Sequence, residues 1–374
     1  MKKLLIAIAA IALLASCSKS QMNYEPDKEI GLSPLTENRT KAMVSTNAFP
    51  NESFAVWAFY KQVKKGTSIT DWQAATAVAQ TTYINEKPFA QRDESGLWGG
   101  QEAAYFWPKE GSLMFVGYYP VSIDKPTNDN PDGLVKYEFT ADVNKMTISG
   151  YTPGDYVSTG FVNNDTNADH AEDFMYFNMT AASCDATTEG PGNSVKGGNH
   201  VDVVFKHALS WLTVTLKKDN NTPAGATITV KKVYFSNVNT TGTGTVNNSP
   251  VTANNETNVI KWETTDVEKN IYVLGTSETN NIEELTNDVY TCKQPVIIPQ
   301  TMDGNIVITY EIKSSDGSAF TETVTFGLSE LTGNVQSWDP AKHYTYNVTI
   351  GTSEILIDPA IEKWVDVTPQ IAIQ

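Results

Sequence analysis

The chain has little of what metal and redox chemistry require. Its 374 residues contain only four histidines and three cysteines, and none of these are paired at a metal-ligand spacing. Zinc, haem and iron–sulfur sites therefore lack ligands, and we expect no metal ion and no cofactor. A Gly-x-Ser-x-Gly elbow, a His-Glu-x-x-His motif and a phosphate-binding glycine loop are absent as well. We therefore predict that the protein is not an enzyme.

Basic residues are also scarce. Lys and Arg number 27 against 43 Asp and Glu, which gives a formal net charge of −16. Such a surface repels polyphosphate, so we expect no nucleic-acid partner. Long helical periodicity is rare, whereas Thr, Val, Tyr, Ile and Asn are abundant in short runs. This composition predicts an all-β protein.

The N-terminus carries an export signal. Lys2 and Lys3 precede an apolar run from residue 4 to residue 14, which is too short to span a bilayer. The following Ala-Ser-Cys resembles a bacterial lipobox, in which the cysteine receives a diacylglyceryl group, the chain is cut just before it and the new amino group is acylated. We predict a signal peptide over residues 1–16 and a lipidated Cys17. Acyl chains contribute about 0.8 kcal/mol per buried CH₂, so two or three anchor a protein firmly.

Two further cysteines remain in the mature chain. Cys184 and Cys292 are far apart in the sequence and are expected in different domains. One disulfide between them is conceivable in an oxidising compartment, but two unpaired thiols fit better.

The rest of the chain divides into two β-rich parts. Residues 17–41 are polar and turn-rich and form a tether or an N-terminal strand. Short strand-like runs then begin, and a Gly/Asn/Thr-rich stretch over residues 182–199 separates them from a second set. We predict domains over residues 42–198 and 199–374. The second set is marked by alternation of apolar and polar residues over 201–205, 209–216, 226–230, 306–310, 322–326 and 344–350.

Two sequence features have a second interpretation. Residues 128–133 place side-chain oxygens at alternate positions before a glycine, as in a calcium loop, but Phe139 stands where the bidentate glutamate is required. A plain turn explains this stretch better. Aromatic residues also gather in three groups that favour a sandwich core over a sugar-stacking platform: Trp57/Phe59/Tyr60, Tyr105/Phe106/Trp107 and Tyr118/Tyr119.

Several motifs in a fixed order resemble those of the fimbrillin family, the Mfa-like subunits of type V pili and related surface adhesins. With the lipobox, they are Tyr105–Phe115 running into Tyr118-Tyr119-Pro120, Phe205–Ser210, Ile298-Pro299-Gln300 and Trp338–Tyr346. The resemblance covers nearly the whole chain. It implies two β-sandwich domains with transthyretin-like topology, exposed at the outer membrane surface or carried in a fimbria.

The resemblance also implies a mode of assembly. In such pilins a protease with trypsin-like preference removes the lipidated N-terminal segment with its first strand, and a terminal strand of another subunit, of the same or a paralogous kind, fills the groove. An open sheet edge offers unpaired N–H and C=O groups that the incoming strand satisfies. The resemblance does not identify a host or bacterial receptor.

Both ends of this chain offer residues for that scheme. Arg39 is one of two arginines and lies in the polar segment before the first confident strand, and Lys41 is an equally good target for cleavage. A solvated tether residue is the alternative interpretation of Arg39. The C-terminal tail keeps an alternating pattern with Val365, Val367, Ile371 and Ile373, which pairs either with its own sheet or with a neighbour's.

A different class of function remains open. A monomeric glycan-binding protein that keeps its lipid anchor would use exposed aromatic residues instead of strand exchange. The two functions differ in one simple respect, because a pilin polymerises after proteolysis and a monomeric binder does not.

Overall fold

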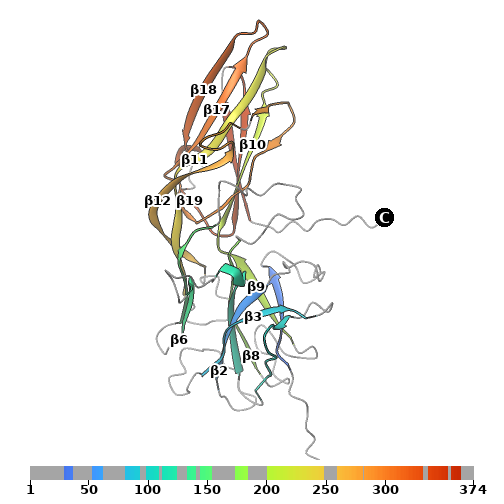
Figure 1. Cartoon of the computed structure of the whole chain (residues 1–374), viewed down its shortest axis with the longest axis vertical. Helices are drawn as coiled ribbons and strands as arrows, with labels where there is room; N and C mark the ends of the chain where they lie inside the picture. The colour runs from blue at the N-terminus through green and yellow to red at the C-terminus, as the bar shows by residue number, and fades with distance from the viewer. Residues whose placement is uncertain are drawn as a thin grey trace, which may run out of the picture.

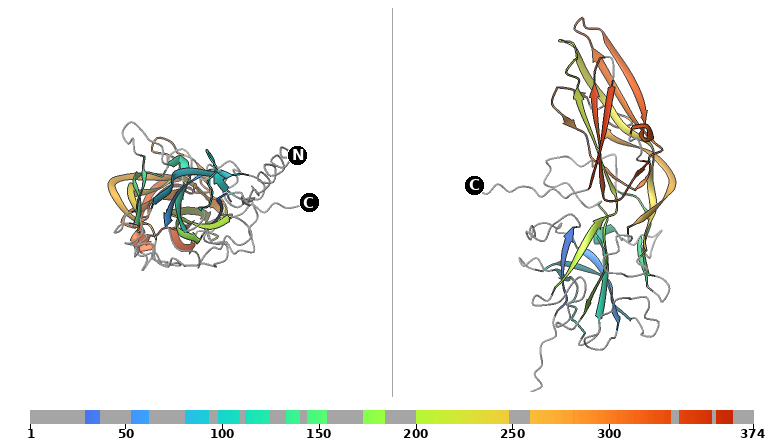
Figure 2. Two further views of the ribbon diagram at one scale, coloured as in Figure 1. Left: turned by 90° about the horizontal axis from the view of Figure 1, so that it is seen from below. Right: turned by 180° about the vertical axis from the view of Figure 1, so that it is seen from behind.

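The computed structural model confirms the all-β class. It describes residues 29–36, 53–61, 81–92, 98–108, 112–123, 133–139, 144–153, 173–183, 200–247, 259–280, 282–331, 336–352 and 355–363. The molecule is elongated, with the described strands gathered into two lobes along its long axis (Figures 1 and 2). Helix is confined, in these ranges, to one turn of 3-10 helix, η2 (Val121–Ile123), and one short α-helix, α2 (Leu328–Leu331). No helix among these residues is long and apolar enough to cross a membrane.

Seven strands of the first lobe close into a barrel. They follow the order β1-β4-β3-β2-β5-β8-β9, in which β1 pairs with β9 and completes the circle. The sequence predicted a sandwich here, and this pairing joins what would be its two open edges. The strands are β1 (Gly31–Thr36), β2 (Phe54–Lys61), β3 (Thr81–Gln91), β4 (Trp98–Gly100), β5 (Ser112–Tyr119), β8 (Met175–Ser183) and β9 (His200–His207).

The central barrel strands are buried on both faces. Along β2, Phe54, Val56 and Ala58 point into the barrel, while Trp57 and Phe59 face a second core outside it. Strand β5 alternates in the same way between the two cores. Double burial explains why these segments are continuous apolar runs without alternation of polar residues.

A sheet shared by both lobes covers the outside of the barrel. Its centre is β11, whose first half pairs with β17 and whose last residues pair with β7. The second core lies between this sheet and the outer faces of β2, β5 and β8. The strands of the shared sheet are β6 (Val135–Phe139), β7 (Asn144–Tyr151), β11 (Thr227–Asn247), β12 (Lys261–Leu274), β13 (Glu283–Glu284), β17 (Asn305–Lys313) and β18 (Ala319–Gly327).

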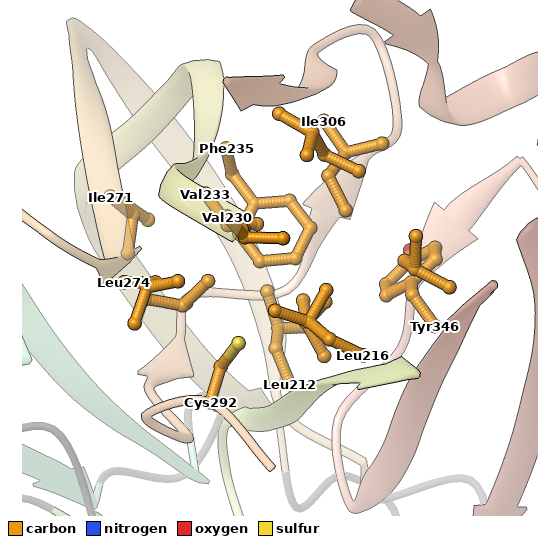
Figure 3. Close-up of a cluster of buried hydrophobic side chains, with 14 of the residues drawn as sticks. Leu212, Leu216, Val230, Val233, Phe235, Ile271, Leu274, Cys292, Ile306 and Tyr346 are labelled. Atoms are coloured by element: carbon orange, nitrogen blue, oxygen red, sulfur yellow. The ribbon is translucent and has the colours of Figure 1, made fainter. Parts of the chain in front are cut away.

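The second lobe is a sandwich of that sheet against another one. The facing sheet has the order β14-β10-β20-β21, with β15 also on β10. Its strands are β10 (Ser210–Lys218), β14 (Tyr290–Thr291), β15 (Val296–Ile297), β20 (Lys342–Ile350) and β21 (Ile355–Lys363). A short pair, β16 (Gln300–Thr301) and β19 (Ser337–Trp338), lies beside them. Between the sheets, side chains such as Leu212, Val233, Phe235 and Ile306 form the sandwich core (Figure 3).

Cys292 belongs to this sandwich core. Its thiol is free and buried, and burial raises the pKa of the thiol far above its ordinary value. The prediction of an unpaired thiol is therefore confirmed for Cys292. Cys184 lies outside the described residues.

The strands predicted in the second half of the chain are confirmed, since each lies, to within one residue at its start, in β9, β10, β11, β17, β18 or β20. The domain boundary near residue 198 stays a prediction. Strand β9, on its C-terminal side, belongs to the barrel, and β6 and β7, on its N-terminal side, belong to the shared sheet.

Candidate functional site

The site of interest is the seam that β1 closes in the barrel. Strand β1 runs parallel to β9 over six residue pairs, from Gly31 opposite His200 to Thr36 opposite Phe205. On its other side, Leu32 pairs with Trp98 of β4. Just before the strand, Ile30 donates its N–H to the carbonyl of Tyr105 at 2.7 Å. The first strand thus has neighbours on both sides.

Side chains of β1 and of the residue just before it fill the barrel interior. Ile30 is 1% exposed and Leu32 is 0% exposed, and both pack with the core residues of the other barrel strands. Burying such a side chain stabilises a fold by about 1.5–3 kcal/mol. Removal of β1 would therefore empty two apolar pockets and leave the hydrogen-bonding groups of β9 exposed along one edge.

An arginine fixes the beginning of this strand. The guanidinium of Arg92, just after β3, forms an ion pair with the carboxylate of Glu29. Its Nη2 also donates to the carbonyl of Gly100 in β4 at 2.9 Å. Both side chains of the ion pair are 37% exposed, so the pair is partly screened by solvent. We call Arg92, together with the Glu29 carboxylate and the Gly100 carbonyl that it contacts, the arginine latch.

Glycines in β4 make room for the latch. A Cβ at Gly99 would come within 2.3 Å of the Arg92 Nε, because the arginine side chain crosses this residue. A Cβ at Gly100 would come within 2.2 Å of the Ala103 carbonyl. Gly99 therefore leaves the space that the arginine side chain occupies, whereas Gly100 is required by the close approach of the Ala103 carbonyl. Sequence reasoning missed the role of Arg92, which it noted only as the second arginine.

The last described strand is held differently. Strand β21 pairs only with β20 among the described residues, in antiparallel register from Lys342 opposite Lys363 to Ile350 opposite Ile355. Ile355 and Ile357 pack against the sandwich core, while Leu356 is 54% exposed. Pro359 lies in the strand, as is tolerated at a sheet edge.

The motifs Phe205–Ser210 and Trp338–Tyr346 meet at the junction of barrel and sandwich. Ala341 donates its N–H to the carbonyl of Leu209 at 2.9 Å, and Ser210 Oγ donates to the carbonyl of Asp339 at 2.8 Å. Ala208 and Leu209 belong to the second core. These motifs therefore fix how the two lobes are joined.

Two histidines pack at this junction, as the sequence suggested for them. His207 is 4% exposed, and its Nδ1 lies 2.8 Å from a carboxylate oxygen of the buried Asp173. The ring of His343 stacks on Trp211 with centroids 3.9 Å apart. Neither histidine lies beside a nucleophile and base arranged for catalysis among the residues described.

Most of the aromatic residues considered for sugar stacking are core residues. Trp57, Phe59, Trp107, Tyr118 and Tyr119 are buried. This confirms the core interpretation for these five. Phe106 is 42% exposed. Its backbone forms an isolated antiparallel β-bridge with Glu29, just before the first strand.

The residues predicted for lipidation, cleavage and strand donation lie outside the described residues. They are Cys17, Arg39, Lys41, Val365, Val367, Ile371 and Ile373. Their roles stay predictions. Most of the possible calcium loop also lies outside, and no cluster of metal-ligating side chains occurs in the described ranges.

Comparisons with known proteins identify a family. Residues 58–364 match the fimbrillin-like family, which confirms the resemblance seen in the motifs. A comparison with curated proteins gives no match. The family consists of structural and adhesive surface proteins, so the match also confirms that the chain is not an enzyme.

Solved structures align with nearly the whole chain at low sequence identity. A fimbrial protein from Bacteroides vulgatus is 18% identical with a TM-score of 0.50, and the alignment covers 90% of this chain and 99% of that chain. The tip fimbrial protein Mfa3 from Porphyromonas gingivalis, with a C-terminal truncation, is 10% identical with a TM-score of 0.33, over 91% of this chain and 100% of that chain.

Proposed function

The chain belongs to the fimbrillin-like family, and we propose that it is a structural subunit of a type V-like fimbria or surface adhesin that assembles by strand exchange. It is exported as a lipoprotein, anchored through Cys17 in the outer membrane, and cut after Arg39 or Lys41. Its tail, with Val365, Val367, Ile371 and Ile373, belongs to the segment that enters the next subunit. The transthyretin-like topology of the two lobes is part of the proposal.

The observation that carries this function is the position of β1. The strand lies upstream of both cleavage candidates, yet it forms a wall of the barrel, and the side chains of Leu32 in the strand and of Ile30 just before it are buried. A cut after Arg39 would break the covalent connection between β1 and the rest of the chain. The barrel would then have an open edge and empty pockets that only another strand can fill.

Strand exchange of this kind produces a fibre. The groove is in the barrel and the donor segment follows the sandwich, so one subunit's end fits a different surface of the next one. When each subunit adds to the end of the previous one along the same direction, such a head-to-tail contact builds an open fibre and not a closed ring. The elongated shape of the molecule suits this stacking (Figure 1).

The monomeric glycan-binding alternative receives no support from the described aromatic residues. Five of the eight considered are buried in the two cores of the first lobe. Their surfaces are occupied by protein contacts and are not available to stack on a sugar.

The test compares processing with polymerisation. Protein sheared from cells should begin at Thr40 or Ala42 and run as a ladder on native gels. A chain with Arg39→Ala and Lys41→Ala together should keep β1 and stay monomeric. As the matched control, Lys28→Ala should still polymerise. Lys28 precedes β1, so cleavage after it would not remove the strand and its loss should have no effect on assembly. Polymers of the uncut double variant would contradict the proposal.

A further inference from the structure

Strand β18 (Ala319–Gly327) forms an open edge of the shared sheet. It pairs only with β17 among the described strands, and it lies at the outside of the second lobe, away from the barrel (Figure 1). Six of its nine residues are exposed, and the ring of Phe320 is 59% exposed. One long side of this strand therefore faces solvent.

This edge lacks the features that usually keep strands of different molecules apart. Lysine and proline at an edge discourage pairing with another chain. Each of the other described edge strands longer than two residues, β6, β12 and β21, contains lysine, and β21 also contains proline. Strand β18 has neither, and Glu322 is its only charged residue. A β-branched and aromatic segment with little charge and no proline is suited to pairing with a further strand.

The backbone of β18 directs every second residue to the open side. At one end of the hairpin with β17, Ser314 donates its N–H to the carbonyl of Ser318 at 2.8 Å, and beyond the other end Leu328 donates to the carbonyl of Gly304 at 3.0 Å. Hydrogen-bonded pairs alternate along an antiparallel ladder, so the even-numbered residues of β18 bond to β17. The five odd-numbered residues direct their N–H and C=O groups outward.

Side chains of β17 hold the outer face of this edge in place. The hydroxyls of Thr309 and Thr323 lie 3.0 Å apart. The hydroxyl of Thr321 donates to the carboxylate of Glu311 at 3.3 Å. Side chains that are already ordered lose less conformational entropy when they enter an interface, so this edge is prepared for a partner.

The sequence of β18 is nearly a palindrome. It reads Ala-Phe-Thr-Glu-Thr-Val-Thr-Phe-Gly, and the residues at equal distances from the central Thr323 match, except that Glu322 stands opposite Val324 and the two end residues differ in one methyl group. In an antiparallel pair of identical strands, a twofold axis places each residue opposite the one at the same distance on the other side of the centre. A palindromic strand therefore meets its own copy with matching side chains.

A pair centred on Thr323 suits both faces of the strand. Thr323 then faces Thr323 of the second copy, and Phe320 faces Phe326, which covers the exposed ring. Threonine pairs and aromatic pairs are both favourable across neighbouring strands. All five outward-facing residues of each copy exchange hydrogen bonds in this register, which gives about ten bonds.

Registers shifted by one residue are less favourable. A centre at Glu322 places the carboxylates of the two copies opposite each other, where like charges repel. A centre at Val324 places Phe320 opposite Leu328, where β18 has ended and α2 begins. Either shift reduces the bonds between the strands to about eight. In the central register Glu322 faces Val324 of the second copy, and no like charges meet within the paired strands.

From these observations we infer that β18 is a self-association surface, on which two copies of this chain pair antiparallel about a twofold axis at Thr323 and join their shared sheets into one. The contact uses neither β1 nor the C-terminal tail, so it does not depend on strand exchange. Because one strand is a small interface, the dimer is reversible and forms at high protein concentration.

The direction of the strand defines what the contact can join. Strand β18 runs along the long axis of the molecule (Figure 1), so the two paired copies point in opposite directions. Such a contact does not extend a fibre end to end. If the proposed function holds, it links two fibres side by side, and the many copies along each fibre strengthen a contact that is weak between single subunits.

Disulfide trapping in the uncleaved full chain tests the register, since β1 stays in place and strand exchange does not contribute. With a mild oxidant, Thr323→Cys should give covalent dimers, because residues directly opposite each other have Cα atoms about 5.5 Å apart. Thr321→Cys and Thr325→Cys should each give only the wild-type background, and a mixture of the two should give dimers. Dimers from none of these samples would overturn the inference, as would equal yields from Thr321→Cys and Thr323→Cys.

Added charge tests whether the edge itself makes the contact. Thr323→Lys places two ammonium groups opposite each other and should weaken dimerisation about tenfold in sedimentation equilibrium. Thr309→Lys is the matched control, because it breaks the same hydroxyl contact and adds the same charge one strand further from the axis. It should change the dissociation constant by a factor of no more than about two.

The same measurement on mixtures completes the test. Thr323→Lys mixed with Thr323→Glu should restore dimers, because opposite charges then face each other across the axis. Equal weakening by Thr323→Lys and Thr309→Lys would overturn the inference. An uncleaved wild-type chain that stays monomeric at every concentration would overturn it as well, whereas failure of the cleaved chain to form end-to-end polymers would contradict only the proposed function.

Discussion

The barrel and the sandwich depend on their terminal strands to different degrees. The barrel is closed by β1, which is separated from its partner β9 by more than half of the first lobe's sequence and is paired on both sides. The sandwich is built from residues that follow one another from β10 onward, and its terminal strand β21 is an edge. Loss of β1 removes a wall of the barrel, whereas loss of β21 removes only a margin of the sandwich. In the proposed strand exchange, the first lobe is therefore the acceptor of a strand and the second lobe is the donor.

The comparison predicts that equivalent substitutions in β1 and β21 have very unequal effects. Leu32→Asp places an unpaired carboxylate in the barrel core and should destabilise the first lobe by about 4 kcal/mol or more. Leu356→Asp, at a position that is 54% exposed, should change stability by less than about 0.5 kcal/mol.

Amide hydrogen exchange read by mass spectrometry checks this difference. In the Leu32→Asp variant, the backbone amides of β4 and β9 should lose their protection from exchange, whereas those of β17 and β20 should keep theirs. Equal loss of protection in both lobes would contradict the idea that the barrel depends on β1 more than the sandwich does.

A glycine in the barrel should be far less replaceable than one in the sandwich. A Cβ at Gly117 of β5 would lie 2.2 Å from the Ala55 carbonyl and 2.3 Å from the Phe177 ring, so Gly117→Ala should cost about 3 kcal/mol. At Gly327 of β18 the nearest atom is the Glu330 side chain at 3.3 Å, which can move aside. Denaturant midpoints of the two variants test this, and similar midpoints would contradict the tight packing of the barrel.

A buried hydrogen bond should specify the sandwich core. Trp338 Nε1 donates to the hydroxyl of Tyr346 at 3.0 Å, and both side chains are buried. Tyr346→Phe leaves the indole N–H unpaired and should cost about 1–2 kcal/mol. Tyr272→Phe on the half-buried face of β12 serves as the control. Thermal melts of both variants give the difference, and an equal loss would assign the effect to the tyrosine ring instead.

Alkaline pH should slightly lower the stability of the sandwich, because it favours deprotonation of a tyrosine in the same core. Burial raises the pKa of Tyr344 to about 12 from its ordinary value of 10.0. Because the folded pKa is above the unfolded one, the contribution is complete below pH 10 and is lost as the pH rises to 12. Denaturant midpoints measured from pH 9 to pH 12 should fall, and the fall should be smaller for Tyr344→Phe. An identical pH dependence in that variant would contradict this assignment.

The sequence predicted individual strands better than it predicted long ones. Regions with clear alternation, such as residues 306–310 and 344–350, form strands as expected. The second half of β11 is rich in Thr, Asn and Gly, and its local sequence is typical of a loop. Its glycines are needed because neighbours approach closely, as a Cβ at Gly244 would lie 2.8 Å from the Ile260 side chain. Such a requirement comes from partners distant in the chain.

The candidate site was predicted only in outline. The resemblance implied that the first strand is removable, and the lack of catalytic motifs predicted that the chain is not an enzyme. The latch was missed because Glu29 and Arg92 are far apart in sequence and approach only when β1 closes the barrel.

The sequence by itself determined the all-β class, the family and the absence of catalytic machinery, because these follow from composition, local alternation and motifs read along the chain. Only the tertiary structure decided which strand closes the barrel and which remains at an edge. Pairing between β1 and β9 depends on residues more than 160 positions apart, and the free energy that favours it comes from a shared core. No local pattern encodes that choice, since β1 and β21 are both short strands with apolar residues and a proline.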